Sequence, residues 1–286
     1  MKWIRHLPNA ITSGNLFCGC LGIVFAFQGN LVMTAYLVGI AAVLDFFDGF
    51  AARMLNVTGE MGKQLDSLAD MVTFGVVPGV VIYQLLSMWV LRQAVANFDL
   101  LATLQGNAPA IPASYYLIPP VGFLVTVFSA LRLAKFNIDS RQTDSFIGLP
   151  TPANTIFICS IPLILDLHSP LRSNTALGNS PINALVSGLS GAVNDSDLFR
   201  FIINPWFLIP LTLISSLLMV AELPLFALKF KNFRWGDNQL RYVFLLLSVL
   251  LLIIFQYLGI PIIILLYVVL SIINNLLNKH RNEVPR

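Results

Sequence analysis

The sequence predicts an all-α, polytopic membrane protein that forms a single helical bundle of about eight spans. Of its 286 residues, 57% are hydrophobic and only 11% are charged, with a mean hydropathy of +0.79. Soluble domains carry about twice as many charged residues. Apolar segments recur at lengths near the roughly 20 residues that a spanning helix needs. Residues 1–286 are therefore expected to form one integral-membrane domain.

The predicted spans follow from the breaks between apolar segments. No charged residue occurs between Ile11 and Leu44, and Gln28-Gly29-Asn30 divides this stretch into two helices. Pro78-Gly79 predicts a kink or break in the long third segment. The first six spans form a core of about residues 1–221, and the last two form a C-terminal pair at about 240–277. The expected spans are 10–28, 31–53, 62–91, 115–136, 152–168, 200–221, 240–256 and 259–277.

The basic residues predict the orientation of this bundle. Of the 17 Lys and Arg residues, only Arg92, Arg172 and Arg200 fall in segments on the outer side when the N-terminus is inside. Such a bias places both termini on the cytoplasmic side, as expected for a protein of the cytoplasmic membrane. Leu167–Phe199 then forms a polar outer loop. The net charge of +3 is mild and follows from this topology, so it does not indicate nucleic-acid binding.

Four aspartates interrupt the apolar pattern. Asp45 and Asp48 share one face of the second predicted helix, and Asp66 and Asp70 share one face of the third. An aspartate deep in a spanning helix costs roughly 2.5–3.5 kcal/mol, so these carboxylates need a compensating partner. The short antiparallel connection at residues 54–61 allows the two acidic faces to meet.

A divalent cation is the partner that best suits these side chains. Carboxylate oxygens without histidine or thiolate favour Mg²⁺ or Mn²⁺. Two such ions, about 3.5–4 Å apart, stabilise both the attacking and the leaving oxygens of a phosphoryl displacement. Gly49 and Gly62 leave room for a ligand to approach the backbone. Arg53, at the end of its helix, is suited to bind phosphate.

The spacing of these residues resembles a known family signature. Residues 45–70 fit D-x-x-D-G-x-x-A-R-x8-G-x3-D-x3-D without a gap, and eight specified positions agree. This is the signature of the CDP-alcohol phosphatidyltransferases, integral-membrane enzymes that move a phosphatidyl or related group from a CDP-linked donor to an alcohol. The resemblance implies two metal ions held by Asp45, Asp48, Asp66 and Asp70, with Asp70 as the general base. It also implies contacts with CDP from Gly49, Ala52, Arg53 and Gly62.

Two polar residues of the first predicted span admit two interpretations. Thr12 and Asn15 lie along one stripe at its cytoplasmic end. They are suited to hydrogen bonds between helices, which such residues commonly make in membranes. Alternatively, they reach the nucleotide or its phosphates, and a similar opening is frequent in the resembling family.

The fourth span ends in two cations on the same side as the aspartates. Arg132 and Lys135 are either topological anchors or ligands of an anionic substrate group, with Thr151 nearby in the next segment. Arg-Leu-Ala-Lys-Phe-Asn at 132–137 and Phe-Ile-Gly-Leu-Pro-Thr-Pro-Ala at 146–153 resemble the serine-accepting branch of the family. That resemblance implies CDP-diacylglycerol and L-serine as substrates, with Arg132, Lys135 and Thr151 near the serine carboxylate or the donor phosphate.

Other functions remain open from the sequence. Another enzyme of the same class would use glycerol 3-phosphate or inositol phosphate as acceptor. An aspartate-rich membrane prenyltransferase would carry two separated acidic motifs and no D-G-x-x-A-R. An ion-coupled transporter would show an inverted repeat and carboxylates near mid-membrane. The last two spans are suited to packing or dimer contacts, and we expect a homodimer.

Overall fold

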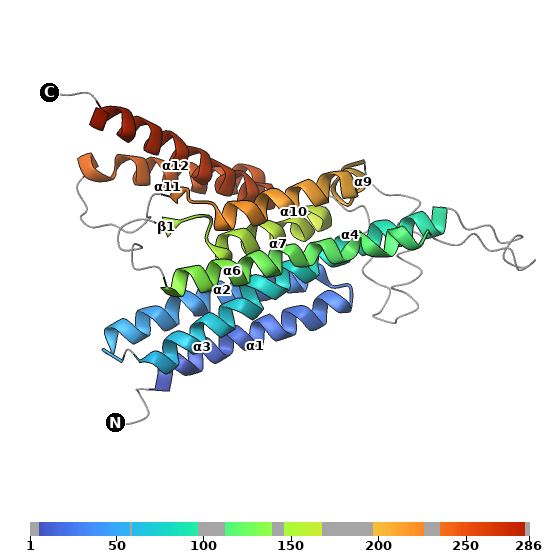
Figure 1. Ribbon diagram of the computed structural model, residues 1–286, viewed down its shortest axis with the longest axis horizontal. Coiled ribbons are helices and arrows are strands. Elements are labelled where there is room, and N and C mark those ends of the chain that lie inside the picture. Colours follow the sequence, from blue (N-terminus) through green and yellow to red (C-terminus); the bar gives the residue numbers. More distant parts are fainter. Residues whose placement is uncertain are drawn as a thin grey trace, which may run out of the picture.

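The computed structural model describes residues 6–57, 59–96, 112–138, 146–167, 197–225 and 235–283, and these segments are almost entirely helical (Figure 1). The first half contains α1 (Leu7–Phe27), α2 (Leu31–Met54), α3 (Glu60–Asp70), the π-helical turn η2 (Met71–Val76), α4 (Val77–Ala96), the 3-10 turns η3 (Ala113–Leu117) and η4 (Pro119–Gly122), and α6 (Phe123–Ile138). The second half contains α7 (Thr151–Leu167), α9 (Asp197–Ile202), α10 (Pro205–Val220), α11 (Trp235–Phe255), η6 (Gln256–Leu258) and α12 (Gly259–Glu283).

Within the described segments, five helical stretches are long and apolar enough to cross a membrane. They are Leu7–Phe27, Leu31–Met54, Glu60–Ala94, Ala113–Ile138 and Asn238–Leu276. The helices Thr151–Leu167 and Pro205–Val220 are apolar but shorter. These helices confirm an all-α membrane fold and lie close to the predicted segments. The number of spans and the side of the termini stay predictions.

The first two helices form a tight antiparallel pair. Gly29, with φ +81°, makes the turn, and the Asn30 side chain caps α2 by accepting a hydrogen bond from the Met33 amide at 3.0 Å. Thr34 then donates through Oγ1 to the Gly22 carbonyl of α1 at 2.9 Å. This pairing fixes the register of α1 against the helix that carries Asp45 and Asp48.

The expected distortion near Pro78 is present as the π-helical turn η2, directly after Asp70. Pro78 has no amide hydrogen, and a proline ring displaces the carbonyl four residues earlier, here that of Phe74. Thr155 of α7 donates to the Phe74 carbonyl at 2.8 Å. Thr126 of α6 donates to the next carbonyl, that of Gly75, at 2.9 Å. The Thr155 hydroxyl thus satisfies the carbonyl that the proline frees inside an apolar bundle, and Thr126 adds a second such bond beside it.

Prolines also account for two differences from the predicted spans. The fourth span begins as the 3-10 turns η3 and η4, because Pro119 and Pro120 cannot donate the α-helical hydrogen bonds. The predicted span at 200–221 is split into α9 and α10 at Asn204. The Asn204 side chain accepts a hydrogen bond from the Trp206 amide at 2.9 Å, and Pro205 opens the new helix.

The hydrophobic core surrounds α4. Val77, Val81, Ile82, Leu85 and Leu86 of this helix are completely buried. Residues of α1, α2, α6, α7 and α10 complete the same cluster. The centre of the bundle is therefore apolar, and α4 extends away from the end at which α3 begins (Figure 1).

The C-terminal helices α11 and α12 form a hairpin beside this core (Figure 1). The break predicted near Gly259 is confirmed, since η6 separates the two helices and Gln256 adopts φ +50°. A second hydrophobic cluster joins Phe244 and Tyr267 of the hairpin to Leu225. Leu225 belongs to strand β2 (Pro224–Leu225), which pairs antiparallel with β1 (Phe146–Ile147). The sequence did not predict this pairing.

Candidate metal and substrate site

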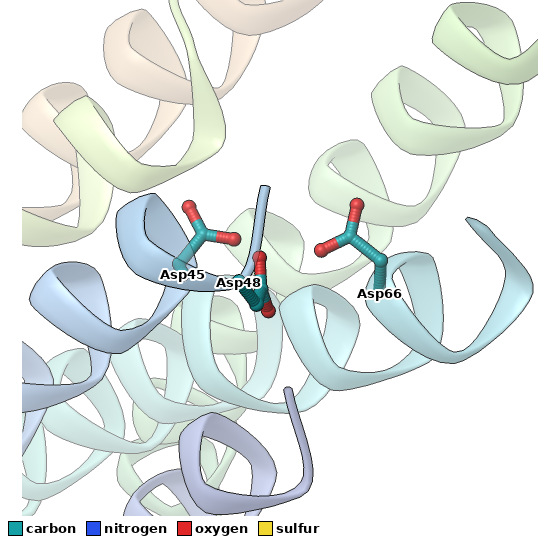
Figure 2. A group of neighbouring side chains, drawn as sticks. All are labelled: Asp45, Asp48 and Asp66. Carbon is teal, nitrogen blue, oxygen red and sulfur yellow. The ribbon is translucent and has the colours of Figure 1, made fainter. Parts of the chain in front are cut away.

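Three aspartates from two helices converge at one end of the bundle. Asp45 and Asp48 of α2 and Asp66 of α3 each offer a carboxylate oxygen, and these oxygens all lie within 4.8 Å of one another. Figure 2 shows the three side chains turned toward a common space. Asp70, the last residue of α3, interacts with both Asp45 and Asp66. The structure thus brings Asp45, Asp48 and Asp66 together from the two predicted helix faces, with Asp70 beside Asp45.

This arrangement fits a hard divalent cation. Oxygens on opposite sides of an octahedral Mg²⁺ lie about 4.2 Å apart, twice the metal–oxygen distance. The observed spread of up to 4.8 Å is only slightly wider, so the spacing of the three carboxylates is compatible with a shared ion. The donors are all carboxylates, and Asp48 is only 5% exposed. Grouped negative charges in such a setting need a cation as partner.

Two polar residues of α1 donate hydrogen bonds to these carboxylates. Thr12 donates through Oγ1 to the Asp48 carboxylate at 2.7 Å, and Asn15 donates through Nδ2 to that of Asp70 at 3.4 Å. Asn15 is itself completely buried, and its backbone carbonyl accepts a hydrogen bond from Thr73 Oγ1 at 3.2 Å. The structure therefore shows the bonds between helices that were one interpretation of this stripe. A contact of Thr12 or Asn15 with nucleotide stays a prediction.

Replacing Thr12 with Val is expected to weaken divalent-cation binding by about 10–100-fold, because partners that orient metal ligands typically contribute that much. The change keeps the shape of the side chain and removes the donor to Asp48. The measurement is the cation concentration that gives half-maximal turnover. Thr12→Ser, which keeps the hydroxyl, should behave as the wild type. The matched control is Ser13→Ala, since the exposed Ser13 hydroxyl bonds only locally to the Asn9 carbonyl. An unchanged cation requirement in Thr12→Val would contradict this role.

The residues expected to contact CDP surround the cluster in different environments. A Cβ atom added at Gly49 would meet nothing within 4 Å, so the space at Gly49 is open. Gly62 lies in the first turn of α3, where an added Cβ would stand 3.2 Å from Asn9 Oδ1. Ala52 is half-buried, and Arg53 is exposed in the last turn of α2. Open space at Gly49 is what the approach of a bulky ligand requires.

Arg132 lies on the inner side of the acidic cluster. It is 8% exposed, and its charge is close enough to attract that of Asp70. Its guanidinium contacts Thr151 Oγ1 at 3.5 Å, and its Nε atom is buried with no hydrogen-bond partner. The structure therefore places Arg132 and Thr151 together on the side of the cluster where Asp70 lies.

Lys135 makes an ion pair that the sequence did not predict. Its Nζ atom lies 3.2 Å from Glu222 Oε1, and the two side chains are 38% and 71% exposed. An ion pair this exposed contributes at most about 1 kcal/mol, so Lys135 is readily released to another anion. This pair was not predictable from the sequence, because Glu222 lies 87 residues from Lys135.

One contact beside the cluster was also missed. Asn137, at the end of α6, donates through Nδ2 to Ser67 Oγ at 2.8 Å. Ser67 directly follows Asp66 in the chain. Both residues lie inside the motifs that carry the family resemblance. Their place in these motifs was the one indication in the sequence that they lie near the site. This bond ties α6, which carries Arg132, to the helix that carries Asp66 and Asp70.

Comparisons with known proteins agree with this geometry. Residues 5–194 match the family model of the CDP-alcohol phosphatidyltransferases. A protein of Bacillus subtilis named CDP-diacylglycerol--serine O-phosphatidyltransferase is 33% identical over 153 residues, which are 52% of this chain and 71% of that protein. A protein of the same name from Helicobacter pylori strain J99 is 34% identical over 170 residues, 59% of this chain and 62% of that protein.

A more distant relative is archaeal. The archaetidylserine synthase of Methanothermobacter thermautotrophicus is 29% identical over 160 residues, 55% of this chain and 58% of that protein. The chain thus spans less than two thirds of the Helicobacter and Methanothermobacter proteins. The family match covers the four aspartates, Arg132 and Thr151, and it ends before α9.

Proposed function

We propose, because the chain belongs to the CDP-alcohol phosphatidyltransferase family, that it transfers phosphatidyl from CDP-diacylglycerol to the hydroxyl of L-serine. The products are phosphatidylserine and CMP. The observation that carries this proposal is the convergence of Asp45, Asp48 and Asp66 within 4.8 Å at signature positions. The names of the Bacillus and Helicobacter relatives support serine as the acceptor.

The four aspartates are suited to hold two divalent cations, Mg²⁺ or Mn²⁺. When bound, the cations neutralise charge on the donor phosphates and on the leaving CMP. Support comes from the all-carboxylate donor set and from Asp70, whose carboxyl group lies beside that of Asp45. Gly49, Ala52, Arg53 and Gly62 would line the CDP moiety, with Thr12 and Asn15 beneath it.

Asp70 is the residue that we assign to the proton transfer. It accepts the proton of the serine hydroxyl as the serine oxygen bonds to the β-phosphorus of the donor. The bond from that phosphorus to the oxygen of CMP breaks, and CMP leaves with the bonding electrons. Two features support Asp70 over the other aspartates: its charge acts on Arg132, and it is the last residue of α3.

Arg132 and Thr151 would bind the acceptor. Arg132 keeps one buried nitrogen without a partner, and a guanidinium is well suited to a carboxylate such as that of serine. Thr151 offers a hydroxyl beside it at the start of α7. Lys135 would join them, or bind the donor phosphate, after leaving Glu222.

The same proposal includes eight spans, a cytoplasmic site and a homodimer. In Figure 1 the start of α1, the end of α12, the end of α2 and the start of α3 lie at one end of the bundle. Arg53, Lys63, Arg132 and Lys135 belong to helix ends at that side, as expected for a cytoplasmic face of the inner membrane. The homodimer is supported by the extensive apolar surface of α11, where Leu246, Ile253 and Ile254 are more than 60% exposed.

The acceptor is tested by release of CMP from CDP-diacylglycerol in the presence of a panel of alcohols. The expected result is metal-dependent CMP release that requires L-serine and yields phosphatidylserine. Full activity with glycerol 3-phosphate or inositol phosphate and none with serine would assign the chain to another branch of the family. No CMP release with any alcohol would exclude the transferase function and favour the transporter alternative.

A further inference from the structure

The C-terminal hairpin of α11 and α12 lies beyond the part of the chain that matches the family, which ends at residue 194. Nothing in the family match therefore gives this hairpin a role. In the structure it is connected, through strand β2, to the segment that leads into Thr151. This connection joins the hairpin to the proposed acceptor side of the site.

The first step of the connection is a set of backbone bonds between the segments 146–149 and 218–225. Phe146 pairs with Leu225, and Ile147 pairs with Pro224. The Gly148 amide donates to the Leu223 carbonyl at 2.9 Å, and the Leu149 amide donates to the Leu218 carbonyl at 2.9 Å. The chain that enters α7 is therefore held along four consecutive residues.

Gly148 shows how closely these two segments fit. It adopts φ +75°, which side chains other than glycine rarely tolerate. A Cβ atom at this position would clash with the carbonyl oxygens of Met219 and Ala221. Because Thr151 follows only three residues later, the position of its hydroxyl depends on this contact.

The second step anchors β2 to the hairpin. Leu225 is 1% exposed and packs with Phe244 of α11 and Tyr267 of α12. Asn275 of α12 donates through Nδ2 to the Pro224 carbonyl. The strand that holds residues 146–149 is therefore anchored to the hairpin by a hydrogen bond and by packing contacts.

We propose that the hairpin of α11 and α12 is a positioning element for the acceptor pocket. Through Leu225 and Asn275 it holds β2, which holds Gly148 and Leu149 and thereby sets Thr151 against Arg132. This inference rests on the proposed function for the identity of the acceptor. The mechanical connection from the hairpin to Thr151 stands independently of it.

The connection is tested by hydrogen–deuterium exchange in detergent or nanodiscs. Asn275→Ala and Leu225→Ala should each raise the exchange rate of the Gly148 and Leu149 amides by about tenfold or more, since these bonds then open locally. The matched control is Leu276→Ala on the same helix, whose side chain is 63% exposed. If Gly148 and Leu149 stay as protected as in the wild type in folded Asn275→Ala, the connection is wrong.

The consequence for the site is tested by steady-state kinetics of the same variants. Asn275→Ala should raise the KM for serine by about tenfold and leave the KM for CDP-diacylglycerol and the cation requirement within about twofold, because only acceptor positioning is disturbed. A general loss of folding would instead lower the active fraction and leave every KM unchanged. That outcome, or an unchanged serine KM with increased exchange, contradicts the proposal. Wild-type protein that releases no CMP with serine contradicts the proposed function and leaves the exchange result as the test of the connection.

Discussion

Asp70→Asn is expected to lower kcat by about 10³-fold or more, while binding of the CDP-linked lipid stays close to that of the wild type. A positioned general base contributes typically about 10²–10⁴-fold, and an amide cannot accept the proton of the attacking hydroxyl. The asparagine keeps the size of the side chain and still offers an oxygen to Asn15 Nδ2. The fold around the π-helical turn is therefore preserved. Single-turnover kinetics with saturating donor separate this loss from weaker binding.

The matched control for this change is Asp166→Asn. Asp166 is a half-buried carboxylate near the opposite end of α7, and 15 residues of helix separate it from Thr151, about 22 Å along the axis. Its amide variant should turn over at the wild-type rate. A wild-type rate in Asp70→Asn would remove Asp70 as the base. Loss of donor binding in that variant would indicate that Asp70 serves chiefly as a metal ligand.

Asp48→Asn should raise the Mg²⁺ concentration needed for activity more than it lowers kcat at saturating Mg²⁺. Asp48 is almost completely buried between Thr12 and the other carboxylates, so its charge contributes directly to any ion bound there. Loss of a ligand should cost at least as much as loss of a partner that orients it, so we expect half-activation to need about 100-fold more Mg²⁺. Excess Mg²⁺ should restore much of kcat in Asp48→Asn.

Comparing the two aspartate variants is the control for this prediction. Excess Mg²⁺ should not restore Asp70→Asn, because added cation does not replace a proton acceptor. Titration of activity against Mg²⁺ for both variants gives the two curves. If Asp48→Asn titrates like the wild type and loses only kcat, the buried carboxylate is not a ligand.

The acidic site was predictable from the sequence because its information is local. Helical spacing places Asp45 with Asp48 and Asp66 with Asp70, and the short connection at 54–61 requires the two helices to be adjacent. The break at Pro78 was predictable for the same reason, since proline removes a particular hydrogen bond. Its form as a π-helical turn was not, and neither were the hydrogen bonds to this turn from Thr126 and Thr155, which come from later helices.

Contacts between distant segments could not be predicted from the sequence. Glu222 pairs with Lys135 across 87 residues, and Phe146 of β1 meets Leu225 of β2 across 79 residues (225 − 146). Two-residue strands leave no periodic pattern to read. Gly148 belongs to the motif at 146–153, but only the structure shows the positive φ and the close approach of Met219 that explain why glycine stands there.

The most direct test counts the Mn²⁺ ions that the purified chain retains in the presence of CDP-diacylglycerol, by electron paramagnetic resonance. We expect about two ions per chain in the wild type, as in two-metal phosphoryl-transfer sites. A variant that combines Asp45→Asn with Asp66→Asn should retain none. Equal Mn²⁺ retention by the wild type and this double variant would contradict a metal site built from α2 and α3.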